Sequence, residues 1–225
     1  AYSTYTSSAD YTQSPNRPID YCDVMSYATY YSGAQFANFD ANWSNGSGTG
    51  LTTGGPSGWT TGLIGAADAY AAGGSTNIAN AFAFVDCDLR QGTNNGVAGG
   101  ETLLALSARY SVWNPLAVTY NKSIELYEGG FEAWYLSTSR CTALGISTTY
   151  GGSTGKFAVL LDAYKKDTLF QTLVTDQYSQ FAAASKSTTW AWLVLTGISQ
   201  WGTMQGSDIL TTTYKSWDAQ VSINH

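Results

Sequence analysis

The sequence predicts an α/β protein with a parallel sheet, on three observations. Segments rich in β-forming residues alternate along the chain with segments whose apolar residues have helical spacing. A nearly continuous apolar run at 190–200 is typical of a strand buried on both faces. The 225 residues suit a single domain, and neither a linker nor a repeat of fixed period divides them. We therefore expect residues 1–225 to form one α/β unit.

The N-terminal half is expected to contain one strand, one long loop and three helices. The strand is rich in tyrosine and ends before a Ser-Gly pair, and the loop is composed mainly of Gly, Ser, Thr and Asn. Loops of this length in compact domains are usually functional. The expected elements are the strand at 20–31, the loop at 33–60, and helices at 63–72, from Asn77 to about Arg90, and from Leu103 to Pro115, with one more helical turn from Pro115 to about Asn121.

The C-terminal half is expected to alternate between strands and helices. Its first strand ends at Glu128, and two glycines then let the backbone turn sharply. A long amphipathic helix is expected after a polar loop, followed by the buried apolar strand and a short closing helix. The expected elements are the strand at 123–128, the loop at 136–155, the helix at 156–184, the strand at 190–200 and the helix at 213–221.

Composition excludes several classes of partner. Charged residues make up only 12% of the chain, the net charge is −6, and no basic stripe indicates nucleic-acid binding. No apolar run approaches the roughly 18 residues of a membrane-spanning helix. Low charge with many Ser, Thr, Asn and Tyr residues is typical of secreted or cell-surface proteins. Since residue 1 is Ala1, we expect a processed or truncated N-terminus.

The single histidine and the cysteines limit the chemistry. His225 is the last residue of the sequence, which argues against Ser-His-Asp or Cys-His catalysis and against a histidine-ligated metal. Cys22, Cys87 and Cys141 fit no zinc-binding spacing. Cys22 and Cys87 lie in segments expected to be buried, which favours inert packing, and one disulfide with a free thiol is the alternative. We expect no metal and no cofactor, so any acid–base chemistry comes from carboxylates or tyrosines.

Glu128 is the leading candidate for a catalytic residue. In parallel α/β enzymes the chemistry lies at the carboxyl ends of strands, and Glu128 ends an expected strand. The alternative is a structural carboxylate that pairs with Arg109 or Arg140. Strand alternation predicts that Glu125, three residues earlier, lies on the opposite face as a structural partner. Glu132, beyond the expected turn, is interpreted as solvated.

A resemblance to a known family supports this interpretation. Tyr-Glu-Gly-Gly after a strand, then a long helix, then a Trp-rich segment ending in Gln200-Trp201-Gly202, resembles the C-terminal part of retaining (β/α)8 glycoside hydrolases. It looks closest to uncharacterised bacterial cellulase-like barrels. The similarity spans about residues 20–221, although only short motifs define it. It implies a (β/α)8-type barrel of which this chain supplies strands six to eight.

The resemblance also implies roles for residues. Glu128 matches the catalytic nucleophile, and the substrate would be a β-linked polysaccharide. The family's acid/base glutamate normally stands in an Asn-Glu pair, which this sequence lacks. Retaining hydrolysis needs two carboxyl groups about 5 Å apart. The acid/base would therefore come from an upstream segment or a second chain that completes the barrel, and the isolated chain would be inactive.

Aromatic residues provide candidate substrate contacts. Tyrosines at the end of the first strand can hydrogen-bond the nucleophile, and tryptophans in loops can stack on sugar rings. The alternatives are ordinary packing for the tyrosines and loop anchoring for the tryptophans. The candidate substrate-binding residues are Tyr30, Tyr31, Trp43, Trp59, Trp134 and Trp201.

Two non-catalytic functions remain open. Low charge and long Gly-rich loops also suit an extracellular structural protein, such as a filament, capsid or matrix subunit that assembles with itself. A glycan-binding module without catalysis is the other alternative. It predicts that affinity for glycans survives the substitution Glu128→Gln.

Overall fold

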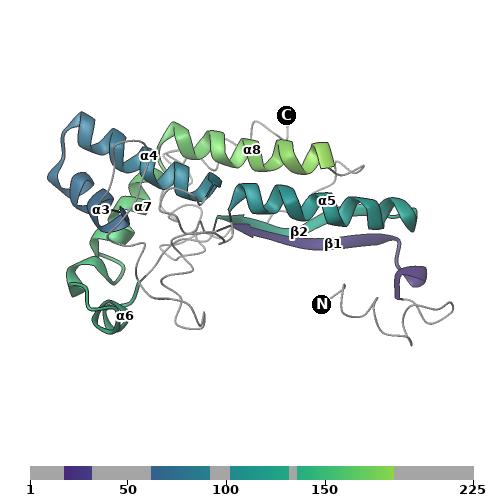
Figure 1. Cartoon of the computed structure of the whole chain (residues 1–225), viewed down its shortest axis with the longest axis horizontal. Helices are drawn as coiled ribbons and strands as arrows, with labels where there is room; N and C mark the ends of the chain where they lie inside the picture. Colours follow the sequence, from purple (N-terminus) through teal and green to yellow (C-terminus); the bar gives the residue numbers. More distant parts are fainter. Residues whose placement is uncertain (1–17, 32–61, 92–101, 132–135, 185–225) are drawn as a thin grey trace, which may run out of the picture.

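The computed structural model describes residues 18–31, 62–91, 102–131 and 136–184 (Figure 1). After a 3-10 turn, η1 (Pro18–Tyr21), strand β1 (Val24–Tyr31) leads to helices α3 (Gly62–Ala72), α4 (Ser75–Gln91) and α5 (Leu103–Thr119). Strand β2 (Ser123–Phe131) is followed by α6 (Thr138–Ala143), the 3-10 turn η3 (Thr148–Tyr150), α7 (Lys156–Tyr164) and α8 (Thr168–Ala184).

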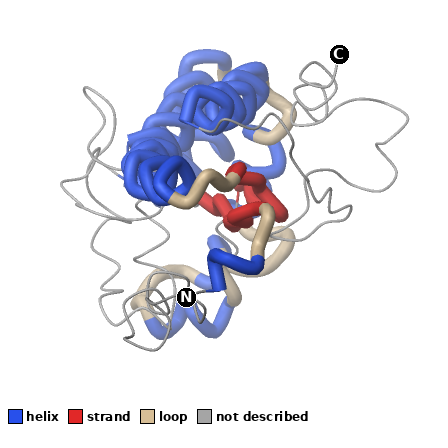
Figure 2. Tube along the Cα trace, turned by 90° about the vertical axis from the view of Figure 1, so that its right-hand side faces the viewer, coloured by secondary structure: helices blue, strands red, loops and turns tan. Residues whose placement is uncertain are grey.

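The described part is elongated and mostly helical. β1 and β2 form a two-stranded parallel sheet, α5 packs on both strands, and α8 packs on α5 (Figure 1). In the turned view the larger group of helices lies on one side of the strand pair, and smaller helical segments lie below it (Figure 2). At one end of the molecule α3 and α4 pack together, and α3 also contacts α7. The parallel pairing confirms the sequence-based expectation for these two strands.

The prediction of a (β/α)8-type barrel fold is wrong. In such barrels each strand is followed by a helix that covers it. Among the described residues, the three helices α3, α4 and α5 lie between β1 and β2 in the sequence, and α3 packs on α4 and α7 instead of covering a strand. The described residues contain only two short parallel strands. The expected strand at 190–200, the loop at 33–60 and the helix at 213–221 lie outside them.

Helix α5 is continuous across Pro115, where the sequence predicts a break. Thr102 caps its first turn by accepting a hydrogen bond from the backbone nitrogen of Ala105, at 3.1 Å. The helix continues through Pro115 to Thr119. Proline removes one backbone hydrogen bond and crowds the carbonyl of Ser111. Both Pro115 and Ser111 are exposed, so water can hydrate that carbonyl and the helix does not stop.

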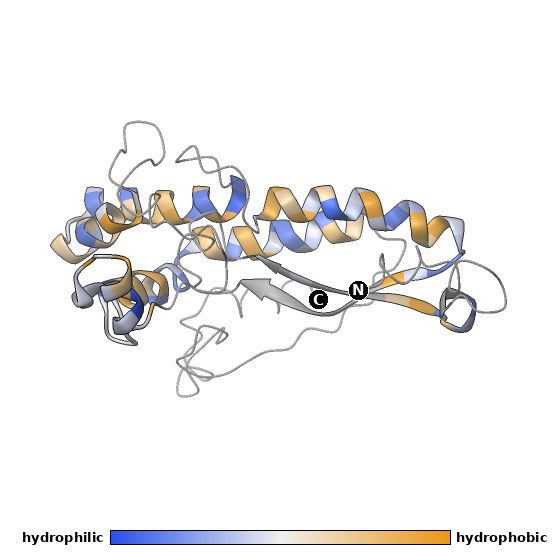
Figure 3. Ribbon diagram, turned by 60° about the horizontal axis from the view of Figure 1, so that its bottom comes forward, coloured by the Kyte–Doolittle hydropathy of each residue, from blue (hydrophilic) through white to orange (hydrophobic). Residues whose placement is uncertain are grey.

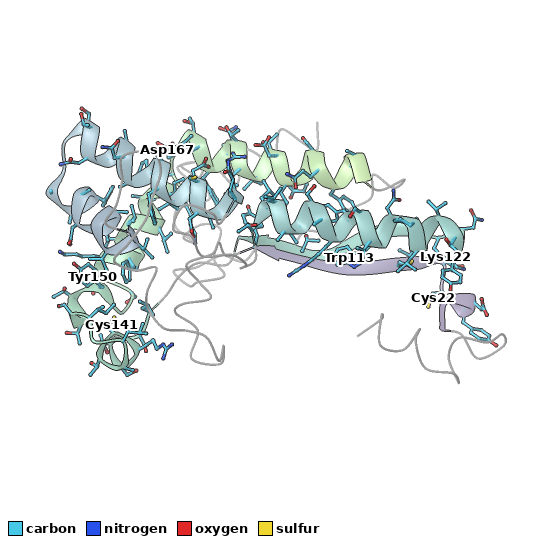
Figure 4. The ribbon with its side chains drawn as sticks, viewed as in Figure 1. Cys22, Trp113, Lys122, Cys141, Tyr150 and Asp167 are labelled. Atoms are coloured by element: carbon cyan, nitrogen blue, oxygen red, sulfur yellow. The ribbon has the colours of Figure 1, made fainter. Side chains whose placement is uncertain are left out.

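The expected helix at 156–184 consists of two helices. The break falls at Asp167, whose side chain accepts a hydrogen bond from the backbone nitrogen of Leu169 at 2.9 Å and so caps α8 (Figure 4). The expected loop at 136–155 contains the short helix α6 and the turn η3. No described helix has the length and apolar character needed to cross a membrane.

Candidate functional site

The carboxyl ends of β1 and β2 meet at one edge of the sheet. Because the strands are parallel neighbours, the segment at Tyr30 and Tyr31 lies beside Gly130 and Phe131. These two stretches are about one hundred positions apart in the sequence. The edge formed by the carboxyl ends of parallel strands is where α/β proteins commonly place their chemistry.

A register shift lies just before this edge. Tyr27 pairs with Leu126, but the next residue, Ala28, pairs with Glu128, so Tyr127 is the extra residue of a bulge. Without the shift, Glu128 would lie opposite Thr29. The shift moves it to the register position of Ala28. Bulges of this kind are frequent next to active sites, where they change the face that a residue occupies.

The positions of β1 on its helical side are defined by burial. Met25, Thr29 and Tyr31 are buried, and the side-chain amide of Gln177 in α8 donates to the backbone oxygen of Thr29 at 3.0 Å. Odd-numbered positions of β1 therefore belong to the helical side of the sheet. Successive strand positions alternate between the two sides of a sheet. Glu128 pairs with Ala28, so its register position has the opposite parity to that of Thr29.

The bulge also corrects the expectation for Glu125. That residue pairs with Ser26, and Glu128 pairs with Ala28. Ser26 and Ala28 are two residues apart on β1, so both glutamates hold register positions of the same parity. Simple alternation over three residues predicts opposite faces, and that prediction is wrong because the bulge adds one residue to β2.

The prediction of a sharp turn directly after Glu128 is also wrong. Gly129 and Gly130 continue β2, paired with Thr29 and Tyr30, and the strand ends at Phe131. Glycine permits a turn without requiring one, and here both residues keep the ladder. Glu128 consequently lies inside the paired strand, three residues before its end.

The other predicted site residues divide into two groups. Tyr30 lies opposite Gly130, and Tyr31 lies opposite Phe131 with no exposed surface. The complete burial of Tyr31 favours the packing role over a substrate contact. The remaining candidates lie outside the described residues, and their roles stay predictions; they are Trp43, Trp59, Trp134 and Trp201.

A charged cluster lies close to the buried end of β1. Arg90 in α4 donates to Asp86 at 2.8 Å and to Asp176 in α8 at 2.5 Å. The hydroxyl of Tyr164 in α7 donates to the other oxygen of Asp86, at 2.8 Å. The cluster thus ties three helices together.

Burial, with a smaller contribution from Tyr178, raises the pKa of Tyr31 above its ordinary value, so its phenol stays protonated at neutral pH.

A second polar cluster lies at the far end of the molecule, near α6 (Figure 4). Asp68 in α3 accepts hydrogen bonds from the hydroxyl of Tyr150, at 2.9 Å to one oxygen, and from Lys156 in α7, at 2.6 Å. Lys156 also lies 5.1 Å from the centre of the Tyr150 ring. Desolvation raises the pKa of Tyr150 to about 12. This cluster fastens η3 and α7 to α3.

Neither cluster is evident from the sequence. The only local signal is the i,i+4 spacing of Asp86 and Arg90 within one helix. Asp176 is 86 positions from Arg90, and Tyr150 is 82 positions from Asp68, so no local pattern connects them. Among the described residues, no group of three or more His, Cys, Asp or Glu side chains is arranged to hold a metal ion.

No disulfide joins any two of the three cysteines, all of which lie in the described part of the chain. Cys22 is exposed, Cys87 is half-buried and Cys141 is buried. The alternative of one disulfide is therefore wrong, and so is the expectation that Cys22 lies in a buried segment. Burial raises the pKa of the Cys141 thiol, which makes this residue a weak nucleophile.

Comparison of the chain with protein-family models, with curated proteins and with solved structures yields no match. A functional proposal for this chain therefore rests on its residues and on their arrangement in the structure.

Proposed function

We propose that this protein is carbohydrate-active and that Glu128 attacks the anomeric carbon of a β-linked glycan. The observation on which the proposal rests is the bulge that pairs Glu128 with Ala28 near the carboxyl end of the parallel strands. A carboxylate at the register position of Thr29 would belong to the side covered by α8, where burial without a partner is costly. The bulge instead gives Glu128 a position of the opposite parity.

Glycoside hydrolysis usually needs two carboxyl groups, and the register suggests a second one. Glu125 holds a position of the same parity, two register positions from Glu128. Strand geometry separates two such backbone positions by about 7 Å. Retaining enzymes hold their carboxyl groups about 5 Å apart and inverting enzymes about 6.5–9.5 Å apart, so product stereochemistry distinguishes the two mechanisms. A glutamate supplied by another segment or chain is the alternative acid.

The test compares three glutamate-to-glutamine variants in the release of reducing sugar from β-glucan, xylan and mannan. We expect Glu128→Gln to lower kcat by at least about a thousandfold, since it removes the group that reacts. Glu125→Gln should lower kcat only if Glu125 is the acid. Glu132→Gln is the matched control and should retain activity. Hydrolysis at equal rates by wild type and Glu128→Gln would refute the catalytic role of Glu128. Absence of hydrolysis by the wild-type chain alone would refute the proposal that Glu125 supplies the acid.

A second candidate function is assembly, and one surface favours it. Leu104, Val112 and Val118 of α5 are 59%, 62% and 49% exposed. Their helical spacing places them on one side of α5. Hydrophobic and hydrophilic stretches alternate along the helices of the described part (Figure 3). A second copy of the chain would cover this side. Concentration-dependent mass in sedimentation, lost in Leu104→Ser/Val112→Ser, would support assembly, whereas a monomer at all concentrations would contradict it.

A further inference from the structure

A groove of about 340 Å³ lies between α5 and α8, on the helical layer. None of its lining residues is charged. Five of its six lining residues carry a hydroxyl or a side-chain amide, although carbon atoms make up the larger part of the exposed lining. The lining residues are Ser107, Tyr110, Ser111, Asn114, Gln180 and Ala183. Its volume is at the low end of the range for small-molecule sites, roughly 300–1,000 Å³.

The groove contains an unsatisfied polar group. The side-chain oxygen of Gln180 is buried and has no hydrogen-bond partner among the described residues. A buried acceptor without a partner is destabilising, so a ligand that reaches it with a hydrogen-bond donor gains affinity. The hydroxyl of Ser111 donates to the backbone oxygen of Ala108 at 2.6 Å, so its lone pairs remain as acceptors.

The aromatic part of the groove is held rigidly. Tyr110 is 3% exposed, and its ring packs edge-on against Trp113 at 5.8 Å and against Phe181 at 5.9 Å between ring centres. Trp113 is on the same helix, α5 (Figure 4), and Phe181 is on α8. Tyr110 therefore forms a rigid floor of the groove, and the hydroxyls and amides around it are the groups available to a ligand.

We propose that this groove binds a neutral polyhydroxylated ligand, one or two sugar units in length. The absence of charge in the lining disfavours phosphates, carboxylates and cations. The side-chain oxygen of Gln180 accepts from a sugar hydroxyl, and the Asn114 amide can both donate and accept. The site shares its ligand class with the proposed function, but it lies on α5 and α8 and does not depend on Glu128. It would anchor a glycan, and it has no part in bond cleavage.

The experiment is calorimetric titration of the full chain with cellobiose and, separately, with myo-inositol. Ala183→Leu fills the groove from an exposed position, and Ala182→Leu places the same side chain on the neighbouring exposed residue outside the lining. We expect saturable binding by the wild type and by Ala182→Leu, and at least tenfold weaker binding by Ala183→Leu. Circular dichroism checks that both variants are folded.

Two further measurements separate this site from the catalytic one. Glu128→Gln should bind cellobiose as the wild type does, whatever its effect on hydrolysis. Gln180→Met should weaken binding while keeping the volume of the side chain. No saturable binding of either probe, or equal affinity of Ala183→Leu and Ala182→Leu, would overturn the groove proposal without affecting the proposal for Glu128.

Discussion

Gln177 of α8 donates hydrogen bonds from its side-chain nitrogen to the backbone oxygen of Thr29, at 3.0 Å, and to the hydroxyl of Thr29, at 3.4 Å. Both residues are buried, with 1% and 0% of their surface exposed. The contact joins a helix to a strand 148 positions away. It holds Thr29 on the helical side of the sheet, and Thr29 is the neighbour of Ala28, where the register shifts. The contact therefore helps to keep Glu128, which pairs with Ala28, at a position of the opposite parity.

Replacing Gln177 with leucine should lower the free energy of unfolding by about 1–2 kcal/mol. The substitution leaves a buried carbonyl of Thr29 without this donor, although it also removes the unpaired side-chain oxygen of Gln177. Urea denaturation measures the change. Thr29→Val is the comparison, because it keeps the backbone hydrogen bond and removes the longer one together with the contact between the Thr29 hydroxyl and Tyr110, and it should cost less. Equal losses in the two variants would show that the backbone contact is unimportant.

Arg90 should contribute more to stability than the exposed ion pairs of the same protein. Its guanidinium joins Asp86 and Asp176, and the Arg90 side chain is 23% exposed. We expect Arg90→Met to cost about 1–3 kcal/mol, since two carboxylates then lose their shared cation. Lys166→Met breaks the exposed i,i+4 pair with Asp162 and should cost less than about 0.5 kcal/mol. Similar losses of unfolding free energy in Arg90→Met and Lys166→Met, measured by urea denaturation, would contradict this prediction.

Local pattern predicted much of the secondary structure. The apolar spacing of α4 and the β-forming composition of β1 were sufficient, because each signal lies within one element. Pro115 misled the prediction of α5, since the cost of a proline depends on whether water reaches the carbonyl that it displaces. The break at Asp167 had a sequence signal, an N-capping Asp before Thr168, which the continuous apolar stripe outweighed.

The candidate site was only partly predictable because its geometry depends on the pairing of segments that are far apart in the sequence. Glu128 follows from its place near a strand end, but its register position does not. The bulge arises from the pairing of Tyr27 with Leu126 and of Ala28 with Glu128, and this pairing joins two distant segments. The groove between α5 and α8 likewise needs two helices placed side by side, so Ser111 and Gln180 carry no local signal.

Two glycines near α6 should be sensitive to the smallest substitution. A Cβ on Gly151 would lie 2.7 Å from the sulfur of Cys141 and 2.9 Å from the backbone oxygen of Ser137. A Cβ on Gly155 would overlap the backbone oxygen of Gly151. We expect Gly151→Ala and Gly155→Ala each to cost about 1–3 kcal/mol through overpacking, measured by thermal denaturation.

Gly74→Ala separates this steric effect from a conformational one. Gly74 has a φ of +87°, and a Cβ added there would have no atom within 4 Å, so alanine meets only the cost of the left-handed backbone. That cost is about 1–2 kcal/mol. In a background with Cys141→Ala, the loss at Gly151 should shrink because the sulfur is gone, and the loss at Gly74 should not change. A loss at Gly151 that is unaffected by Cys141→Ala would show that Cys141 is not the obstacle.

Buried tyrosines should make the fold sensitive to alkali. Desolvation raises the pKa of Tyr110 to about 12, and burial raises the pKa of Tyr164 well above its ordinary value of 10.0. Above pH 10 the unfolded chain loses phenolic protons that the folded chain keeps, so the folded state binds more protons and stability falls as pH rises. Each fully buried phenol contributes up to about 1.4 kcal/mol per pH unit in this range. Absorbance at 295 nm should show these phenols ionising together with unfolding.

Lys165 should have the opposite effect at lower pH. It is 5% exposed, and desolvation lowers the pKa of its amine to about 8, although Asp162 opposes the shift. Between pH 8 and the unfolded value of 10.5 the unfolded chain holds a proton that the folded chain has released, so stability rises with pH. Together with the tyrosines this predicts maximal stability near pH 10. Urea denaturation from pH 7 to 11 should show the rise, and Lys165→Met should remove it while leaving the alkaline decline. A flat profile between pH 8 and 10 in the wild type would mean that the amine of Lys165 keeps its ordinary pKa in the folded chain.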